Sequence, residues 1–133
     1  MAGLLVVGEG ALRAAETMLR AVGARSVLLR MPMAAAGGDE TEQLGLAQPG
    51  YQDVELRPCV FRKTGARKEL LVSAVAVRMV VGSLEFDSAA VLFKTAAGVV
   101  LDDAMFEIEG VTPVESQGVA TCYRVNLRAA VGW

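Results

Sequence analysis

The first apolar pattern along the chain has the spacing of a helix. From Gly10 to Gly23, apolar residues recur every three to four positions and form one narrow stripe. Glu16 stands four residues before Arg20, which is the favourable order for an ion pair along a helix. A glycine such as Gly23 commonly follows the last helical residue. The pattern therefore predicts an N-terminal helical segment, residues 1–24, that packs on a larger body.

Two segments with strand-like character follow the helix. Ser26 to Met31 is predicted as a strand that ends at Pro32, and Gln52 to Arg62 alternates between apolar and charged positions. Because Pro58 cannot donate to a β-ladder, we expect an open side or a bulge there. Between the two segments, residues 32–50 show no periodicity and are predicted to form a long loop. Loops of this length in small domains are usually functional or disordered.

The middle of the chain leaves alternatives open. Glu69 to Val81 is dense in valine and favours a strand that is buried on both faces. The run has no clear alternation, so a short helix starting at Ser73 is the alternative. Further along, Asp87 or Ser88 is suited to cap a short helix that continues to Ala96.

The end of the chain is predicted to be a three-stranded meander. Its strands are Met105 to Ile108, Val111 to Glu115 and Val119 to Leu127, with turns at Gly110 and at 117–118. The predicted fold class is therefore mainly β (α+β). We expect a small antiparallel β-barrel or sandwich with an N-terminal helix, a long loop and room for a short second helix. Residues 1–133 are predicted to form a single domain, with the barrel in residues 25–133.

Composition restricts the function more than it identifies it. Hydrophobic residues make up 53% of the 133 residues, which exceeds the usual share. Either an alanine-rich composition or apolar surface buried between subunits explains the excess. The longest apolar stretch, Leu70 to Val81, is too short to span a bilayer, and Gly3 to Val7 lacks the features of a signal peptide. We therefore expect a soluble cytoplasmic protein without a membrane partner.

The charged residues do not suggest a strong nucleic-acid interface. The net charge is −2, and the sequence contains no histidine. The only local basic cluster is interpreted as a solvated hairpin tip; it comprises Arg57, Arg62, Lys63, Arg67 and Lys68. The two cysteines, Cys59 and Cys122, are expected to be reduced thiols, with too few other ligands for a zinc site.

No sequence motif predicts catalysis. Gly8-Glu9-Gly10 lacks the third glycine of a dinucleotide-binding turn, because Arg13 occupies that position. Asp102-Asp103 is interpreted as an acidic turn before a strand, since adjacent residues point in different directions. The serines lack a histidine base and a nucleophile-elbow motif. We therefore expect a protein that is not an enzyme and that uses no cofactor or metal.

The stretch from Asp53 to Arg128 resembles the head-closure (head–tail connector) proteins of tailed phages. The resemblance rests on Asp102 to Gly110, on Val114 and on Gln117 to Arg128. These match a turn, a strand ending in glycine, a second strand, a glycine turn and a final aromatic-x-Val-x-Leu strand. In that family they form the closing meander of a small β-barrel, and the opening strands flank an extended loop. The tail-terminator proteins are the neighbouring family.

The resemblance implies a structural role in the virion neck, with assembly in the host cytoplasm. A ring of identical copies, expected to be a hexamer, would contact the portal or adaptor ring on one side. On the other side it would contact a tail-terminator or tail-tube protein. Packaged DNA would pass through without specific binding. The alternatives are a tail-terminator ring, a non-viral β-barrel binding module, and an enzyme whose site is not visible in the sequence.

The long loop is the predicted interaction site. It is acidic, carries no lysine or arginine between Met33 and Gly50, and is too poor in large apolar residues to repay its ordering alone. An acidic channel lining would repel DNA phosphates, whereas the apolar side chains would dock on a neighbouring ring. The candidate residues are Met33, Asp39, Glu40, Glu42, Leu44, Leu46 and Tyr51.

Overall fold

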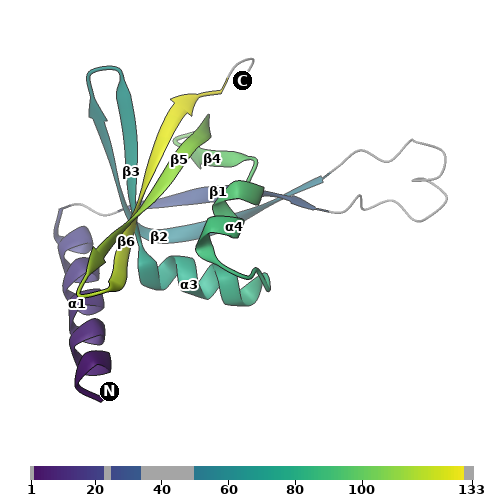
Figure 1. Ribbon diagram of the computed structural model, residues 1–133. Helices are drawn as coiled ribbons and strands as arrows, with labels where there is room; N and C mark the ends of the chain where they lie inside the picture. The colour runs from purple at the N-terminus through teal and green to yellow at the C-terminus, as the bar shows by residue number, and fades with distance from the viewer. Residues whose placement is uncertain (1, 23–24, 34–49, 131–133) are drawn as a thin grey trace.

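Six antiparallel strands form a closed barrel in the order β1-β2-β3-β6-β5-β4 (Figure 1). The computed structural model describes residues 2–22, 25–33 and 50–130, and it describes side chains from residue 10 onward. The strands are β1 (Arg25–Met33), β2 (Gly50–Thr64), β3 (Arg67–Ser73), β4 (Gly98–Leu101), β5 (Ala104–Ser116) and β6 (Val119–Ala129). The helices are α1 (Ala2–Ala21), α3 (Ala74–Ser83) and α4 (Ala89–Thr95). The predicted mainly β fold with an N-terminal helix is confirmed, in its barrel form.

The core lies inside the barrel and follows from alternation along the strands. In β1, Val27, Leu29 and Met31 are buried while the residues between them are more exposed, as a half-buried strand requires. In β6, Val125 and Leu127 are buried in the same way. Val125 and Leu127 are two residues apart and therefore lie on one face of the predicted strand. Leu56 of β2, Leu70 and Val72 of β3, and Val99 of β4 complete the centre of this core.

The predicted bulge at Pro58 is confirmed. Arg25 of β1 pairs with Cys59 of β2, but Val27 pairs with Leu56, so β2 carries one extra residue across this step. The bulge lies where β2 passes from its pairing with β1 to its pairing with β3. It therefore marks the corner at which one long strand serves two hairpins.

The run from Glu69 to Val81 changes from strand to helix at Ser73, so the single buried strand predicted for it is wrong. The Ser73 hydroxyl accepts a hydrogen bond from the Ala76 backbone N–H at 3.4 Å, which caps α3. Helix α3 then buries one apolar face against the barrel, including Val77 and Val80. Tertiary packing thus outweighs the β-preference of the valines, and the alternative short helix is confirmed.

The predicted short helix before Ala96 is confirmed as α4. The Ser88 hydroxyl accepts a hydrogen bond from the Val91 backbone N–H at 3.2 Å and caps the helix. Leu92 and Phe93 are the buried residues of α4, and they anchor it to the rest of the molecule. Helix α4 contacts α3 and β5, so it lies beside the last part of the barrel.

The closing meander exists and all three predicted ranges are strand, but the turn predicted at Gly110 is wrong. Met105 to Ile108 and Val111 to Glu115 belong to one continuous strand, β5, rather than to two strands separated by a turn. Ile108 pairs with Leu127 and Gly110 with Asn126, so the glycine stands beside a one-residue bulge. The meander's first strand is β4, which the sequence pattern did not predict.

Strand β4 closes the barrel through few pairings. It pairs with β1 at Leu28, Leu29 and Arg30, and with β5 on its other side. The turn to β5 consists of Asp102 and Asp103, with φ of 51° and 63°, as a tight hairpin turn requires. The acidic turn predicted for this pair is confirmed.

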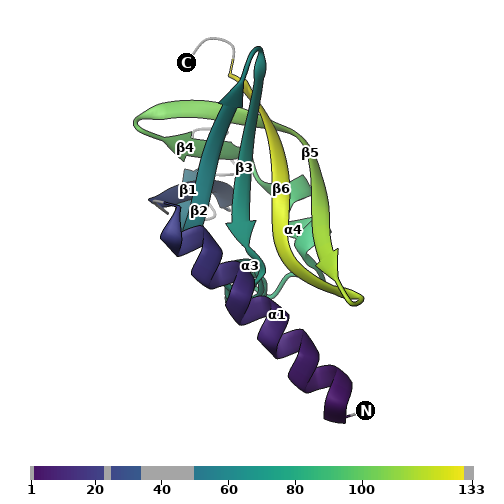
Figure 2. The same cartoon turned by 90° about the vertical axis from the view of Figure 1, so that its left-hand side faces the viewer.

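Helix α1 lies within the predicted helical segment 1–24, begins before the apolar pattern that starts at Gly10, and lies on the outside of the barrel. Gly8-Glu9-Gly10 falls inside the helix and not in a turn. The helix contacts β6, β2 and β3, and Leu12 and Leu19 are its buried side chains. Figure 2 shows its N-terminal part extending beyond the barrel.

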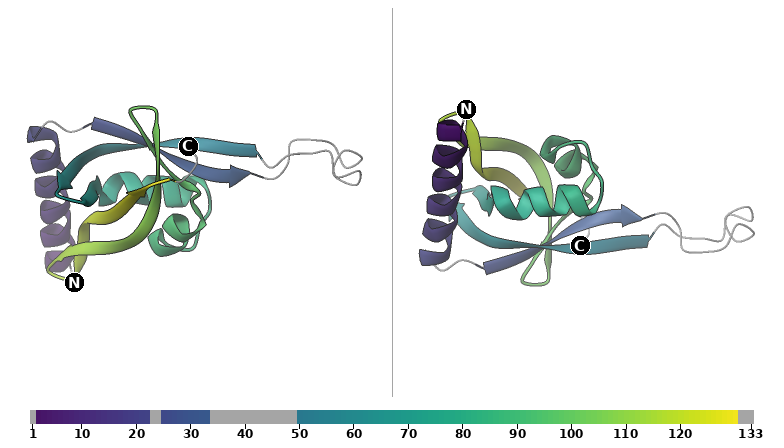
Figure 3. Two further views of the ribbon diagram at one scale, coloured as in Figure 1. Left: turned by 90° about the horizontal axis from the view of Figure 1, so that it is seen from above. Right: turned by 90° about the horizontal axis from the view of Figure 1, so that it is seen from below.

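Two hairpins also project from the barrel, in different directions (Figures 1 and 3). The β1–β2 arm comprises residues 30–33 and 50–53, at the end of that hairpin remote from α1. The β2–β3 tip comprises residues 62–68, around the turn at Gly65 and Ala66. Both hairpins contain β2, which spans 15 residues.

Candidate interaction surfaces

Among the described residues, no group of three or more histidine, cysteine, aspartate or glutamate side chains could hold a metal ion. Cys59 and Cys122 are both free thiols. Burial raises the pKa of Cys59 to about 11 and also raises the pKa of Cys122. Both thiols are therefore protonated at neutral pH and are poorly suited as nucleophiles.

Two of the predicted site residues lie together at the end of the β1–β2 arm. Met33 pairs with Gly50, and Tyr51 pairs with Pro32 on the facing strand. Met33 is 45% exposed and Tyr51 is 56% exposed, so the arm presents apolar and aromatic surface. The remaining predicted residues lie outside the described part of the chain; they are Asp39, Glu40, Glu42, Leu44 and Leu46.

An ion pair braces the base of this arm. Arg30 on β1 donates two hydrogen bonds to the Asp53 carboxylate on β2, at 2.9 and 3.0 Å. The guanidinium also lies 5.9 Å from the centre of the Tyr51 ring, a cation–π distance. The hydrogen bond from Arg30 lowers the pKa of Asp53, against a smaller opposing effect of burial. The ion pair thus joins β1 to β2 close to Tyr51, which lies on β2.

A groove of about 830 Å³ lies between α4, β5 and the adjoining part of β6. Its apolar lining includes Phe93 of α4, Ile108 and Val111 of β5, and Tyr123 of β6. The Phe93 and Tyr123 rings pack at a centroid distance of 5.9 Å. The groove also contains glutamates from β5, among them Glu109 at the bulge. This arrangement suits an apolar ligand or side-chain docking better than bond-making chemistry.

Further apolar side chains are exposed on the helices. Met18 and Val22 of the α1 segment are 69% and 66% exposed, and Met79 of α3 is 71% exposed. Methionine is flexible and adapts well to contact surfaces. Helices α1 and α3 therefore carry exposed apolar surface that suits contact with a partner.

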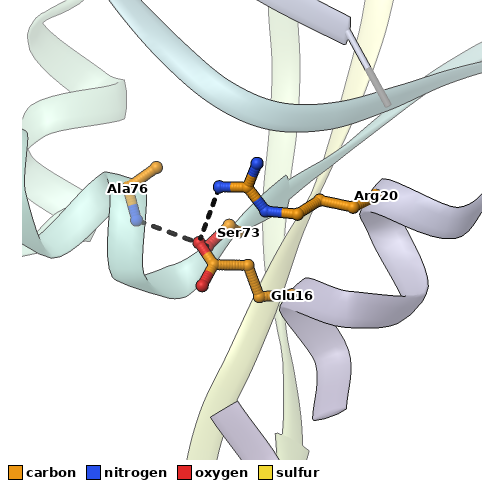
Figure 4. A network of polar contacts seen from close by, with 4 residues as sticks. All are labelled: Glu16, Arg20, Ser73 and Ala76. Carbon is orange, nitrogen blue, oxygen red and sulfur yellow. Dashed lines mark hydrogen bonds and ion pairs between the residues drawn. The ribbon is translucent and has the colours of Figure 1, made fainter. Parts of the chain in front are cut away.

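A polar network holds α1 against the junction of β3 and α3 (Figure 4). The Ser73 hydroxyl donates to the Glu16 carboxylate at 3.5 Å while it caps α3. Arg20 lies 3.8 Å from the same carboxylate, so the predicted i,i+4 pair is present. The network links α1 to the start of α3 through Ser73.

The basic residues predicted to form a solvated hairpin tip do lie at a tip, except for Arg57. Residues 62–68 form the end of the β2–β3 hairpin, whereas Arg57 lies at the β2 bulge. Arg62 pairs with Glu69 across the hairpin at 2.6 Å. Lys63 and Arg67 are exposed, and Lys68 is half-buried.

Sequence reasoning missed the groove and the exposure of Met18 and Met79. The groove depends on how α4 is placed against β5, and no local pattern encodes that contact. The exposure of Met18 was hidden because it shares the apolar stripe of α1 with residues that are buried. The sequence carries no signal that separates Met18 from its buried neighbours in this stripe, because the extent of the contact with the barrel depends on the fold.

No helix among the described residues has the length and apolar character needed to cross a membrane. Comparisons of the chain with protein-family models, with curated proteins and with solved structures found no match. The functional interpretation consequently rests on the described surfaces and on the sequence resemblance.

Proposed function

We propose that this protein is a structural subunit of a tailed-phage neck. Identical copies form a ring that joins the DNA-filled head to the tail and helps to retain the genome. The portal or adaptor ring contacts one side, and a tail-terminator or tail-tube protein contacts the other. The ring is hexameric, is assembled in the host cytoplasm and stays in the virion.

The main support is the placement of exposed apolar side chains on separate parts of a small barrel. Tyr51 and Met33 lie on the β1–β2 arm, whereas Met18 lies on α1. Figures 1 and 3 show α1 and this arm on opposite sides of the barrel. A protein with one partner needs one such surface, whereas a ring subunit between two other rings needs several.

The barrel also agrees with what the resemblance implies. Its last strands, β4, β5 and β6, form an antiparallel meander. Strands β1 and β2 flank residues 34–49, as the opening strands of the family flank an extended loop. A subunit with α1 on one side and the arm on the other favours head-to-tail contacts between copies, which close into a ring when the rotation allows it.

The tail-terminator position is the first alternative, because such a subunit uses the same kinds of contact with different neighbours. The second is a non-viral β-barrel binding module. The groove beside α4 favours this second alternative, since its volume of about 830 Å³ lies in the range of small-molecule sites. The groove is also open to solvent and contains several glutamates, so it would accept a side chain of another protein equally well.

Particles assembled with and without this protein test the proposal. We expect its absence to give filled heads and finished tails that remain separate, and imaging of complete particles to locate it between them. Finding joined, infectious particles without the chain would overturn the neck role. Tails of irregular length in its absence would instead assign it to the tail-terminator position.

The groove alternative has a separate test. Ala120 lines the groove, and the larger side chain of an Ala120→Trp variant should block a small-molecule site there. The conservative Ala120→Ser variant is the control. Under the neck proposal, both variants bind no small ligand, and the particle assay decides the function. If a small ligand raises the thermal midpoint of the parent protein and Ala120→Trp abolishes this increase, the result would favour the binding module.

A further inference from the structure

The positively charged side chains fall into two groups that differ in their surroundings. Most arginines on the strands are paired with carboxylates, as Arg25 is with Asp102 and Arg128 is with Glu107. At the β2–β3 tip, Lys63, Arg67 and Lys68 have no ion-pair partner among the described residues. The protein has a net charge of −2, yet it concentrates unpaired positive charge at one end of one hairpin.

The pairing register of this hairpin brings like charges together. Lys63 lies directly opposite Lys68 across the ladder, and Arg67 lies opposite Thr64 next to them. Like charges at directly opposed positions destabilise a hairpin. Folding therefore gains nothing from this arrangement, whereas a polyanion bound across the tip would relieve the repulsion.

Nearby carboxylates do not neutralise the three side chains. Glu69 is the acidic residue of the hairpin, and it is already paired with Arg62 at 2.6 Å and with Arg124 at 3.3 Å. Glu109 lies in a shallow hollow of about 490 Å³ that also contains Arg67, Lys68 and Arg128. Even with Glu109 counted, the surroundings of the tip remain positive.

The chemistry of the tip fits nucleic-acid phosphates better than an acidic protein surface. Its turn consists of Gly65 and Ala66, and these residues and the adjoining Thr64 are small and exposed. Protein interfaces are built around a buried apolar or aromatic centre and are depleted in lysine. Phosphate contacts need only accessible cationic side chains, and lysine and arginine supply these without reading the base sequence.

We propose that the β2–β3 tip contacts the phosphate backbone of nucleic acid, without sequence preference, through Lys63, Arg67 and Lys68. The inference rests on the charges of the tip and does not require the neck role. In a ring, the same tip would be repeated once per copy. Three contacts per copy give weak, strongly salt-dependent binding, which agrees with DNA that passes without being held at a specific sequence.

Binding of the full-length protein to a fluorescent 30-base-pair duplex at low salt tests this inference. We expect log K to fall with log salt concentration with a slope of about −3 per copy, as three phosphate contacts predict. The variant Lys63→Gln/Arg67→Gln/Lys68→Gln should lose at least tenfold in affinity. Its thermal midpoint should not fall, because the substitutions remove a like-charge pair.

The matched control removes the same charge elsewhere. Arg57, Arg78 and Lys94 are exposed, have no ion-pair partner among the described residues, and lie on β2, α3 and α4. The variant Arg57→Gln/Arg78→Gln/Lys94→Gln has the same net charge as the tip variant, and it should keep most of the affinity.

Three outcomes would overturn the inference. The first is that the parent protein does not bind the duplex at about 20 mM salt. Salt this low strengthens phosphate contacts, so about three of them should be detectable. The second is an equal loss of affinity in the tip variant and the control variant, which would make binding a general effect of charge. The third is displacement of the duplex by polyglutamate at a matched charge concentration as effectively as by unlabelled duplex. That result would favour an acidic protein as the partner.

Discussion

Ser73 connects three elements through one hydroxyl group. It ends β3, caps α3 and donates to Glu16 of α1, while its side chain is almost fully buried. A buried hydroxyl that satisfies two partners contributes at both ends of its interactions. The sequence indicated Ser73 as the start of a helix only as the alternative to a buried strand. It gave no indication of the link to α1, because Glu16 is far away along the chain.

We expect Ser73→Ala to lower the free energy of unfolding by about 1–2 kcal/mol, through loss of the cap and of the bond to Glu16. Ser88→Ala is the control, because Ser88 caps α4 at an exposed position. It should cost about 0.5–1 kcal/mol. Urea unfolding measures both. A Ser73→Ala variant that is no less stable than Ser88→Ala would show that the link to α1 contributes nothing.

The two cysteines should differ in reactivity. Cys59 is fully buried, donates a hydrogen bond to the Arg25 carbonyl at 3.1 Å and has a pKa of about 11. Cys122 is only partly buried. At pH 8 we expect an alkylating reagent to modify Cys122 in the native protein and Cys59 only after unfolding, as mass spectrometry will measure. In denatured protein without reductant, failure to modify both thiols would contradict the free-thiol state.

At the level of elements, local pattern worked where a strand has one face in the core. Residues 26–31, 52–62 and 119–127 alternate in the sequence, and each lies within an observed strand. It failed where the pattern was short or misleading. β4 has four residues without alternation, and Gly110 suggested a turn although it lies beside a bulge. Only long-range pairing decides such cases, and one sequence does not show it.

Gly98 at the start of β4 should be intolerant of a side chain. A Cβ atom there would collide with the Phe106 carbonyl oxygen and with the Met105 side chain. We expect Gly98→Ala to lower the free energy of unfolding by about 1–3 kcal/mol, as overpacking usually does. Gly110→Ala is the matched control, because nothing lies within 4 Å of its added Cβ. Equal stability of the two variants would contradict the close approach of β4 to β5.

The ion pair at the base of the β1–β2 arm should make stability depend on pH. Because Arg30 lowers the pKa of Asp53 below its usual value of 3.8, the pair stabilises the fold above that pH. The stabilisation is lost as the pH falls through the lower, folded-state pKa. Both side chains are partly exposed, at 23% and 31%, so we expect Asp53→Asn to cost only about 0.5–1 kcal/mol at pH 7.

Unfolding at pH 7 and at pH 3 and below measures this effect. The difference between the parent protein and Asp53→Asn should shrink at the lower pH, as Asp53 becomes protonated. Glu55→Gln, at an exposed position on the same strand, should show no such difference. A stability difference that stays constant over this range would contradict the role of the Asp53 charge.

At the scale of the whole molecule, the packed core and the projecting hairpins are separate parts of the fold. The described core consists of residues on the strands and on α3 and α4. Among the described residues of the β1–β2 arm, Met31 is the one that belongs to this core. The sequence predicted the packed body, whereas most of the long loop it predicted lies outside the described residues. Of the candidate residues at this site, the structure places Met33 and Tyr51 on exposed surface, so the assignment of the loop as an interaction site stays a prediction.

Replacing Ala34 to Gln48 by a short Gly-Ser linker tests that assignment. We expect the thermal midpoint to change by less than a few degrees, because the described core lies elsewhere. Heads should fail to join tails or should lose DNA, because the proposed docking surface is gone. Normal yields of infectious particles from this variant would show that the loop is dispensable.

One strand forms part of both projecting hairpins. Strand β2 runs without interruption from Gly50 at the arm to Thr64 at the tip, with the bulge at Pro58 between its two pairing partners. Tension applied between the two ends would therefore run along covalent backbone bonds. It would not have to cross the hydrogen bonds that join one strand to the next. The surfaces at the two ends are thus tied together mechanically, and a pull on one reaches the other without first opening the barrel.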